Sequence, residues 1–354
     1  SWKIDTNYFI PDQEFHNLKQ LLFNNNFKDA SLLREKMAYE MMAFAGVPAG
    51  HVTYVEFWVD IVDDEMEPEY LGIYTMVERV DSKFVGNRFG RDQGIGNLYK
   101  ADGFFEQGAA DLAYYGESIE DYPKPRGVVA YGLQTNLDDP DYSGIINLCR
   151  VIDGVEYAST DDFASALEEV FNVDGYLRYL AVIFTSLDMD TYPYTGNNFY
   201  LYENPATGRV EFLPWDLNNS WGHFGGDATF PLYGKSCCLG PLQWAPLFTR
   251  VFEVPEYRQD YAAYVDLLLR HWFNAEQVSR MVVGWQALLA PHLTISTGDR
   301  MFVGPDAMFT LEEFSRDGQD IITLTAERAE YLRPILASGQ WRTDIPEANI
   351  KPVP

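Results

Sequence analysis

The amino-acid sequence predicts an α+β fold, with strands in the N-terminal part and mostly helices in the C-terminal part. Apolar side chains alternate with polar or smaller ones at 55–61 and again at 71–77, which predicts a β-hairpin. From about residue 141 onward, the apolar spacing changes to that of amphipathic helices. The chain has 354 residues, which is enough for two lobes and a sizeable core.

Changes in sequence character divide the chain into three parts. Residues 1–103 are predicted to form an N-terminal lobe of strands and one helix. Residues 104–142 are rich in Gly, Pro, Asp and Tyr with little periodicity, so we expect an irregular insertion or a connection between lobes. Residues 143–354 are predicted to form a helical C-terminal lobe.

The first helix is predicted at 27–45, where apolar residues recur every fourth position and a Gly and a Pro follow. Its polar face carries Arg34, Glu35 and Lys36. We expect this face to be solvated, although Arg34 and Lys36 are also placed to reach an anion if a site lies nearby.

The segment 84–96 is predicted to be a glycine-rich loop that leads into a short strand at 97–100. Such loops can place backbone N–H groups around phosphates, and Lys100 supplies a positive charge. The spacing matches neither a Walker nor a Rossmann motif, so a plain surface loop fits equally well. The acidic loop at 63–69 could bind Ca²⁺, but we favour a charged hairpin tip that needs no ligand.

The C-terminal part contains a series of helical patterns separated by loops. We predict helices at 143–153, 162–171, 174–186, 246–254, 257–272, 275–290, 311–318 and 321–336. Three cysteines cannot form a disulfide framework, but Cys149 could pair with Cys237 or Cys238.

The stretch 187–222 gathers polar groups around a second predicted hairpin, with strands at 198–202 and 209–215. Antiparallel pairing brings the residues before the first strand and after the second strand to one end. Carboxylate and carboxamide oxygens gathered in this way suit Mg²⁺ or Ca²⁺. The polar residues at this end are Asp188, Asp190, Asn197, Asn198, Asp216, Asn218 and Asn219.

Composition excludes several classes of function. The formal charge of −27, without a basic cluster, argues against a nucleic-acid partner. The apolar runs are too short and too interrupted for a membrane span. The five histidines include no HExxH pair, so zinc hydrolase chemistry is disfavoured.

Blocks distributed over most of the chain resemble the spore-coat CotH kinase family, which is similar in architecture to protein-kinase-like folds. The most specific blocks are NNFYLY and PWDLN, within 197–222. The resemblance implies a two-lobed kinase-like fold with a catalytic hairpin, and transfer of phosphate from ATP to a protein Ser or Thr hydroxyl with Mg²⁺, or Mn²⁺ or Ca²⁺, between the lobes. The matching blocks are at 32–49, 70–81, 96–100, 197–222 and 246–261.

The order of polar residues around the hairpin matches the roles that phosphoryl transfer requires. By analogy with protein kinases, Asp216 is assigned as the principal metal ligand and as part of the catalytic pair, with Asn198 as the second ligand. Asp190 is assigned as the carboxylate that orients the substrate hydroxyl. Asp188 is a rival for that position, and a structural network capping the hairpin is the alternative for the whole set.

For contact with the nucleotide phosphates, the kinase analogy selects Lys100, with Glu78 as its ion-pair partner on a neighbouring strand. Arg34 is a further candidate. The alternative for Glu78 and Lys100 is an ordinary surface pair.

Two other classes of function stay open on the sequence. One is a catalytically degenerate kinase-like protein that acts as a surface adhesin or scaffold, and the other is a carbohydrate-active enzyme, in keeping with the 15% aromatic content. Transfer of AMP instead of phosphate is a variant of the kinase interpretation. We expect a monomer that acts on a protein substrate, located outside the cell or on a cell or spore surface as a trimmed secreted form.

Overall fold

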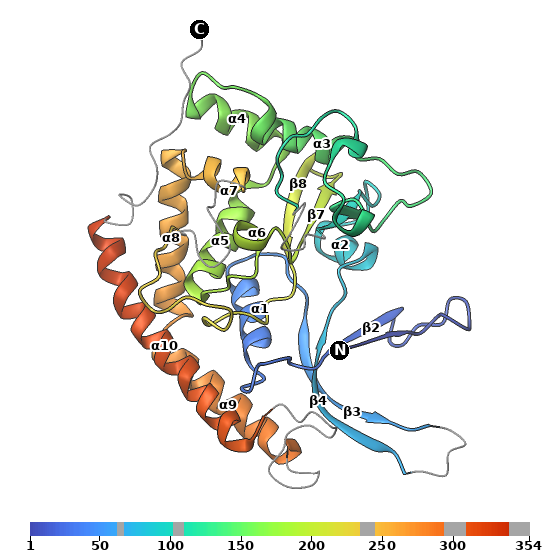
Figure 1. The fold of residues 1–354 in the computed structure, drawn as a ribbon, viewed down its shortest axis with the longest axis vertical. Coiled ribbons are helices and arrows are strands. Elements are labelled where there is room, and N and C mark those ends of the chain that lie inside the picture. The colour runs from blue at the N-terminus through green and yellow to red at the C-terminus, as the bar shows by residue number, and fades with distance from the viewer. Residues whose placement is uncertain (62–66, 102–109, 234–244, 294–308, 340–354) are drawn as a thin grey trace.

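The computed structural model describes residues 1–61, 67–101, 110–233, 245–293 and 309–339. Within these ranges the chain forms two antiparallel β-sheets and a set of helices that pack beside them (Figure 1). The predicted α+β class is therefore confirmed. No helix in the described ranges is long and apolar enough to cross a membrane.

The first sheet has the strand order β1-β2-β4-β3 and contains the predicted N-terminal hairpin. Its β3–β4 pairing places Val55 opposite Tyr74, so the alternation read from the sequence sets the two faces. One face packs against the first helix, and the other carries a small apolar cluster around Phe57. The strands are β1 (Trp2–Asp5), β2 (Gln20–Asn24), β3 (Val52–Val59) and β4 (Glu69–Val77).

The second sheet has the order β6-β5-β7-β8 and combines strands from distant parts of the sequence. The hairpin predicted within 187–222 is confirmed as β7 and β8. The short strand that carries Lys100 is also confirmed, and it pairs with β7 so that Lys100 lies opposite Tyr200. This pairing brings Lys100 to the hairpin. The strands are β5 (Leu98–Ala101), β6 (Tyr131–Leu133), β7 (Phe199–Asn204) and β8 (Arg209–Pro214).

The first helix, α1 (Arg34–Phe44), begins later than the predicted 27–45. Lys28 and Leu32 have positive φ angles, which a right-handed helix does not allow. The expectation of a solvated polar face is wrong, because Arg34 and Glu35 are both buried.

The predicted glycine-rich loop at 84–96 is wrong in its first part, because a helix, α2 (Ser82–Phe89), occupies residues 84–89. The Asp81 side chain accepts hydrogen bonds from the first-turn amides of Lys83 and Phe84, which caps the helix. Gly86 sits inside this helix, where a Cβ would lie 2.5 Å from the Arg91 guanidinium group. The glycine therefore allows a close contact instead of breaking the helix.

The predicted C-terminal helices are confirmed with shifted ends, except that 311–318 and 321–336 form one helix. Gly318 does not end that helix; instead, a Cβ there would meet the Gln286 side chain of the neighbouring helix at 2.2 Å. A π-helical turn, η3 (Arg150–Gly154), extends α3. The helices are α3 (Ser143–Cys149), α4 (Thr160–Val170), α5 (Val173–Ser186), α6 (Tyr192–Thr195), α7 (Pro246–Val251), α8 (Pro255–His271), α9 (Ala275–Leu293) and α10 (Leu311–Ser338).

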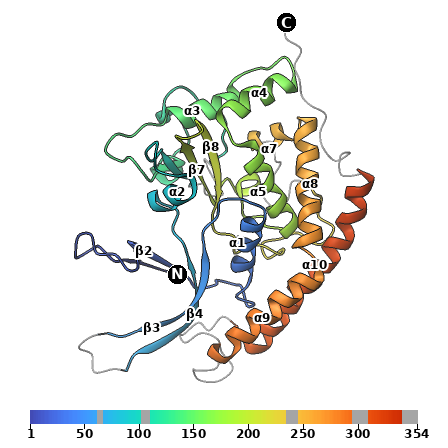
Figure 2. The same cartoon turned by 180° about the vertical axis from the view of Figure 1, so that it is seen from behind.

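Helix α5 occupies the centre of the helical part, in contact with α1, α8 and β8. Helices α9 and α10 pack together, and α10 runs along the outer side of α8 and α9 (Figure 2). A continuous apolar core connects α1, α5, the second sheet and the C-terminal helices. Cys149 lies buried in this core as a free thiol. Its predicted pairing partners, Cys237 and Cys238, lie outside the described ranges.

Candidate active site

The open end of the β7–β8 hairpin is held by two residues in the left-handed conformation, Asn198 (φ 61°) and Asp216 (φ 53°). Asn and Asp adopt this region more readily than most residues, which explains their placement at the two strand ends. The Trp215 N–H donates to the Asn198 carbonyl at 3.1 Å and closes the hairpin. The predicted meeting of the two polar groups is therefore present.

The loop after α5 joins the same end of the hairpin through Asp190. The Asn198 side-chain amide donates to the Asp190 carbonyl at 2.8 Å. The Asn219 side-chain amide donates to Asp190 Oδ2 at 2.9 Å. Three segments, one before β7, one at its start and one after β8, thus converge on Asp190.

Asp188 and Asp190 occupy different environments although they are two residues apart. Asp188 is 1% exposed and accepts from the Ser220 hydroxyl at 3.1 Å and from the Asp190 N–H at 3.2 Å. Burial, followed by the charge of Asp190, raises the pKa of Asp188 to about 8. Asp190 as a whole is only partly buried, but its Oδ1 atom is buried and has no hydrogen-bond partner among the described residues.

Helix α1 brings a further carboxylate, Glu35, to this end of the hairpin. The Asp216 N–H donates to the Tyr39 hydroxyl at 3.3 Å, and Glu35 lies one turn before Tyr39 on the same helix face. Glu35 is 2% exposed and accepts from the Asn24 amide at 2.8 Å. Burial, followed by the charge of Asp216, raises the pKa of Glu35, so the two carboxyl groups are neighbours.

The sequence-based interpretation missed Glu35 because it assumed an exposed polar face on α1. Lys36 and Glu40 form an i,i+4 ion pair on the more exposed side of α1, whereas Glu35 lies on the side of Tyr39 and Met42, which are buried. The signal that could have found Glu35 is its spacing of four and seven residues from these two apolar positions. A charged residue on the buried side of a helix is expected to have a partner.

Lys100 lies close to Asp216, as the predicted role requires. It is partly buried on β5, and its positive charge acts to lower the pKa of Asp216. Burial and the charge of Asp190 act more strongly in the opposite direction, so the pKa of Asp216 is raised overall. The structure thus brings Lys100, Asp190, Asn198 and Asp216 together.

The other two predicted residues lie elsewhere. Glu78 pairs with the Arg88 guanidinium group at 2.6 Å and does not form the predicted ion pair with Lys100. Arg34 is 5% exposed, with its guanidinium group held by the carboxylates of Asp29 and Asp317, each at 2.6 Å. Arg34 therefore has no free face with which to bind an anion.

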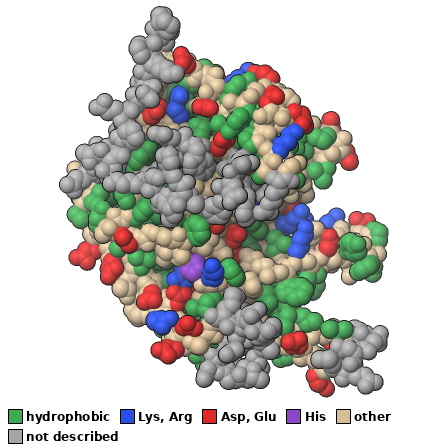
Figure 3. Space-filling view, viewed as in Figure 1, with side chains coloured by type: hydrophobic (Ala, Val, Ile, Leu, Met, Phe, Trp, Pro, Cys, Tyr) green, Lys and Arg blue, Asp and Glu red, His purple; other side chains and the backbone are tan. Residues whose placement is uncertain are grey.

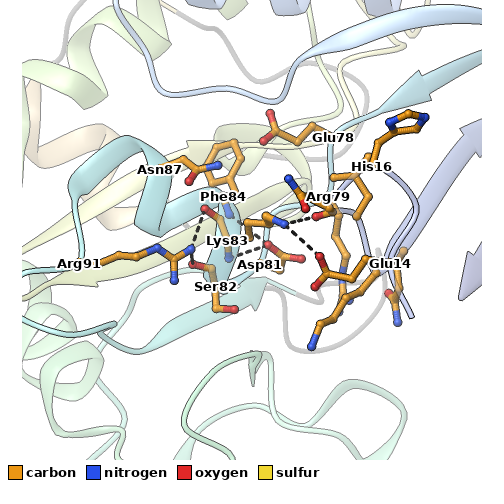
Figure 4. A pocket seen from close by; sticks show the side chains of 14 residues that line it. Glu14, His16, Glu78, Arg79, Asp81, Ser82, Lys83, Phe84, Asn87 and Arg91 are labelled. Carbon is orange, nitrogen blue, oxygen red and sulfur yellow. Dashed lines mark hydrogen bonds and ion pairs between the residues drawn. The ribbon is translucent and has the colours of Figure 1, made fainter. Parts of the chain in front are cut away.

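A pocket of about 540 Å³ lies between the β1–β2 connection and α2, and none of Lys100, Asp190 and Asp216 is among its lining residues (Figure 4). Lys and Arg side chains gather on the surface between β2 and α2 (Figure 3). Tyr200 of β7 does not line the pocket; burial raises its pKa, and the charges of Arg79, which lines the pocket, and of Asp216 also act on it. The charged and histidine side chains of the lining are Glu14, His16, Lys19, Glu78, Arg79, Asp81, Lys83 and Arg91.

No group of three or more His, Cys, Asp and Glu side chains in the described ranges is arranged as a metal site on its own. A cation at the hairpin would therefore need the Asn198 amide beside Asp216, together with oxygen atoms from a ligand. This donor set suits Mg²⁺, which commonly binds through one or two carboxylates plus substrate phosphates. It suits Ca²⁺ less well, because Ca²⁺ takes six to eight oxygen ligands.

The fold and the site together define an α+β protein with a buried carboxylate and amide centre at the end of a hairpin. The model of the CotH family, described as CotH kinase protein, matches residues 1–332, and the chain belongs to this family. It is also similar to inner spore coat protein H of Bacillus subtilis (strain 168). The two are 22% identical over 337 residues, which cover 93% of this chain and 82% of that protein.

Proposed function

We propose that this chain is an ATP-dependent protein kinase that transfers a phosphoryl group to a Ser or Thr hydroxyl. The observation that carries the proposal is the meeting of Asp190, Asn198, Asp216 and Lys100 at one end of the β7–β8 hairpin. Phosphoryl transfer needs a metal site, a positive charge for phosphate and a carboxylate for the nucleophile. These four residues supply the required groups, and they support a two-lobed, kinase-like arrangement.

Asp216 and Asn198 would hold the divalent metal. Their side chains offer the hard oxygen donors that Mg²⁺ or Mn²⁺ prefers, and an Asn218 Oδ1 atom nearby in sequence is buried without a hydrogen-bond partner among the described residues. When bound, such a metal neutralises phosphate charge and orients the transferred group. Lys100 would add a point charge for the phosphates, next to the carboxylate that binds the metal.

Asp190 would accept the proton of the substrate hydroxyl. Its Oδ2 is fixed by Asn219, and its Oδ1 is buried without a hydrogen-bond partner among the described residues, so Oδ1 is the oxygen that would accept from a substrate hydroxyl that reaches it. Asp188 is buried too deeply for that task. Its contacts with the Asp190 N–H and with Ser220 give it the role of supporting the loop.

The pocket beside α2 would receive the nucleoside part of ATP. Its volume of about 540 Å³ falls in the range of small-molecule and cofactor sites. Glu78 and Arg79 line it, and Arg79 lies near Tyr200, which in turn lies near Asp216. This assignment keeps Glu78 at the nucleotide site, as a lining residue and not as the partner of Lys100.

The similarity to a spore coat protein supports a location on the spore or cell surface, with another surface protein as the substrate. A kinase-like protein without activity, used as an adhesin or scaffold, would not require the metal ligands and Lys100 to be brought together. A measurement of nucleotide binding therefore distinguishes the kinase proposal from the adhesin proposal.

The test replaces Asp216 by Asn in the full chain. We expect phosphate transfer from ATP to protein to fall by about 10²-fold or more, because the metal loses its charged ligand. We also expect the thermal stabilisation by ATP with Mg²⁺ to disappear while the metal-free melting temperature is kept. Asp138→Asn, at an exposed position, is the matched control.

Turnover retained in Asp216→Asn would remove that residue from the mechanism. If the wild-type chain showed no thermal shift at millimolar ATP with Mg²⁺, the scaffold function would be favoured. Intact-mass measurement of the modified protein distinguishes an added phosphate from an added AMP.

A further inference from the structure

We propose that Asp317, on the C-terminal helix α10, is a positioning residue that holds α1 and its Glu35 and Tyr39 against the site through Arg34. The importance of that position for catalysis rests on the proposed function, whereas the positioning itself does not. The inference goes beyond that function, because Asp317 lies far from the hairpin in sequence and contacts none of its residues in the described network.

The contact between α10 and α1 is a bidentate ion pair in which Arg34 is buried and Asp317 is partly buried. The two Arg34 terminal nitrogens donate to the two Asp317 oxygens at 2.6 Å each. Asp317 Oδ2 also accepts from the Ser31 N–H at 2.9 Å, just before α1 begins. The parallel geometry of two charge-assisted bonds fixes orientation as well as distance.

Asp29, five residues before α1 begins, completes the network. Its carboxylate accepts from Arg34 Nη1 at 2.6 Å and from the Arg34 N–H at 3.0 Å. Burial acts to lower the pKa of Arg34, but the carboxylates of Asp29 and Asp317 more than offset this and raise it. Arg34 is thus a charged residue whose location depends on both carboxylates.

Residues that touch the site follow Arg34 directly along α1. Glu35 is next in sequence and is adjacent to Asp216, and the Tyr39 hydroxyl accepts the Asp216 N–H. Asp216 has a left-handed backbone, which needs support from its surroundings. A rotation or shift of α1 would therefore change the support of the proposed metal ligand.

Helix α10 also contacts the segment that follows Asp216 in the chain. The Trp221 indole N–H donates to the Thr325 hydroxyl at 3.0 Å, and the Trp221 N–H donates to the Ser186 carbonyl at 2.5 Å. Thr325 is eight residues after Asp317, about 12 Å along the helix. One rigid helix thus contacts α1 near one end and the segment that follows Asp216 further along.

Helix α10 is itself anchored independently of Asp317. Arg328 is buried and donates to the Phe184 carbonyl at 2.9 Å and to the Ala228 carbonyl at 3.0 Å. Gln286 of α9 donates to the Phe314 carbonyl at 2.7 Å. Because these contacts remain when Asp317 is changed, the substitution is expected to loosen α1 without releasing α10.

The experiment measures amide hydrogen exchange in the full chain for wild type, Asp317→Asn and Asp320→Asn. Asp320 is an exposed residue on the same helix and serves as the matched control. In Asp317→Asn, we expect exchange of the α1 amides and of the Asp216 N–H to rise about tenfold or more, while α8 stays within about twofold. Arg34→Lys keeps the charge but loses the fork geometry, so a smaller rise in the same amides is expected.

Unchanged exchange in α1 for Asp317→Asn would overturn the proposal. A similar rise in α1 and α8 would also overturn it, because that result describes general destabilisation. If the local rise is found and the wild type transfers phosphate, kcat of Asp317→Asn should fall about tenfold with little change in KM for ATP. If the local rise is found in a protein without any phosphotransfer activity, positioning stands and the proposed function fails.

Discussion

Two aspartates separated by one residue can have different tasks when their solvent access differs. Asp188 follows the left-handed residue Leu187 at the end of α5 and turns into the core. Asp190 lies at the partly exposed edge of the same loop, bridged to Asn198 and Asn219. The depth of each side chain below the surface, which depends on tertiary packing, supports the proposed choice of Asp190 over Asp188.

Activity measurements on two matched variants test this assignment. Asp190→Asn should lower kcat by about 10²–10⁴-fold, as expected for the loss of a general base. Asp188→Asn keeps a side-chain acceptor for Ser220 or the Asp190 N–H, and should lower kcat by less than about tenfold. Kinetic assays of both variants under the same conditions check the prediction, and the reverse order of effects would give Asp188 the substrate-facing role.

The raised pKa of Asp188 predicts that the stability of the fold depends on pH. An aspartate in an unfolded chain has a pKa of about 3.9, and Asp188 in the folded protein has one of about 8. Because the folded pKa is the higher one, the stability that Asp188 contributes is complete below about pH 4 and is lost as the pH rises through about 8.

Asp188→Asn removes this titration. Between pH 5 and 8, we expect the free energy of unfolding of metal-free wild type to fall relative to that of Asp188→Asn, by about 3–4 kcal/mol. Urea titrations of both proteins with EDTA present would measure it. A constant difference across this pH range would mean that Asp188 is ionised in the folded protein throughout.

At the scale of elements, apolar alternation predicted the strands well, whereas glycines were wrongly interpreted as signals for loops and helix ends. The β3–β4 and β7–β8 hairpins were predictable because each has apolar alternation and turn residues. Gly86 and Gly318 were interpreted as loop or boundary signals, but both lie inside helices where another side chain approaches closely. Such contacts involve partners distant in sequence or in another element, so local patterns do not reveal them.

The close contact between the β5 and β7 segments requires a glycine at position 96. A Cβ at this position would lie 1.8 Å from the Glu203 carbonyl oxygen, a backbone atom that cannot turn away. Gly96→Ala should therefore destabilise the fold by about 2 kcal/mol or more, because the two strands must separate. It should also displace Lys100 from Asp216.

Gly284→Ala is the matched control, since Gly284 lies within α9 with open space around its Cα. This change should stabilise the chain by about 0.5–1 kcal/mol through helix propensity. Thermal unfolding of both variants measures the two effects. A Gly96→Ala variant as stable as wild type would show that β5 and β7 are not packed as closely as described.

At the scale of the whole molecule, the site depends on groups that are far apart in sequence. Glu35 comes from α1, Lys100 from β5, Asp190 from the loop after α5, and Asp216 from the end of the hairpin. The sequence located the hairpin residues because they are neighbours along the chain. The interpretation did not bring Glu35 to the site, and it paired Lys100 with Glu78, because the partners of these residues depend on how the elements pack in three dimensions.

This assembly predicts that ATP with Mg²⁺ stabilises the whole fold and that Lys100 is required for the effect. A ligand at a hundred times its Kd adds about 2.7 kcal/mol to the free energy of unfolding. Lys100→Met removes the positive charge beside Asp216, so the ATP-dependent rise in melting temperature should be largely lost. Lys3→Met, at an exposed position on β1, should keep the full rise. If both variants kept the full rise in melting temperature, Lys100 would not contribute to nucleotide binding. If both variants lost the rise, the cause would be the change in overall charge and not a specific contact of Lys100.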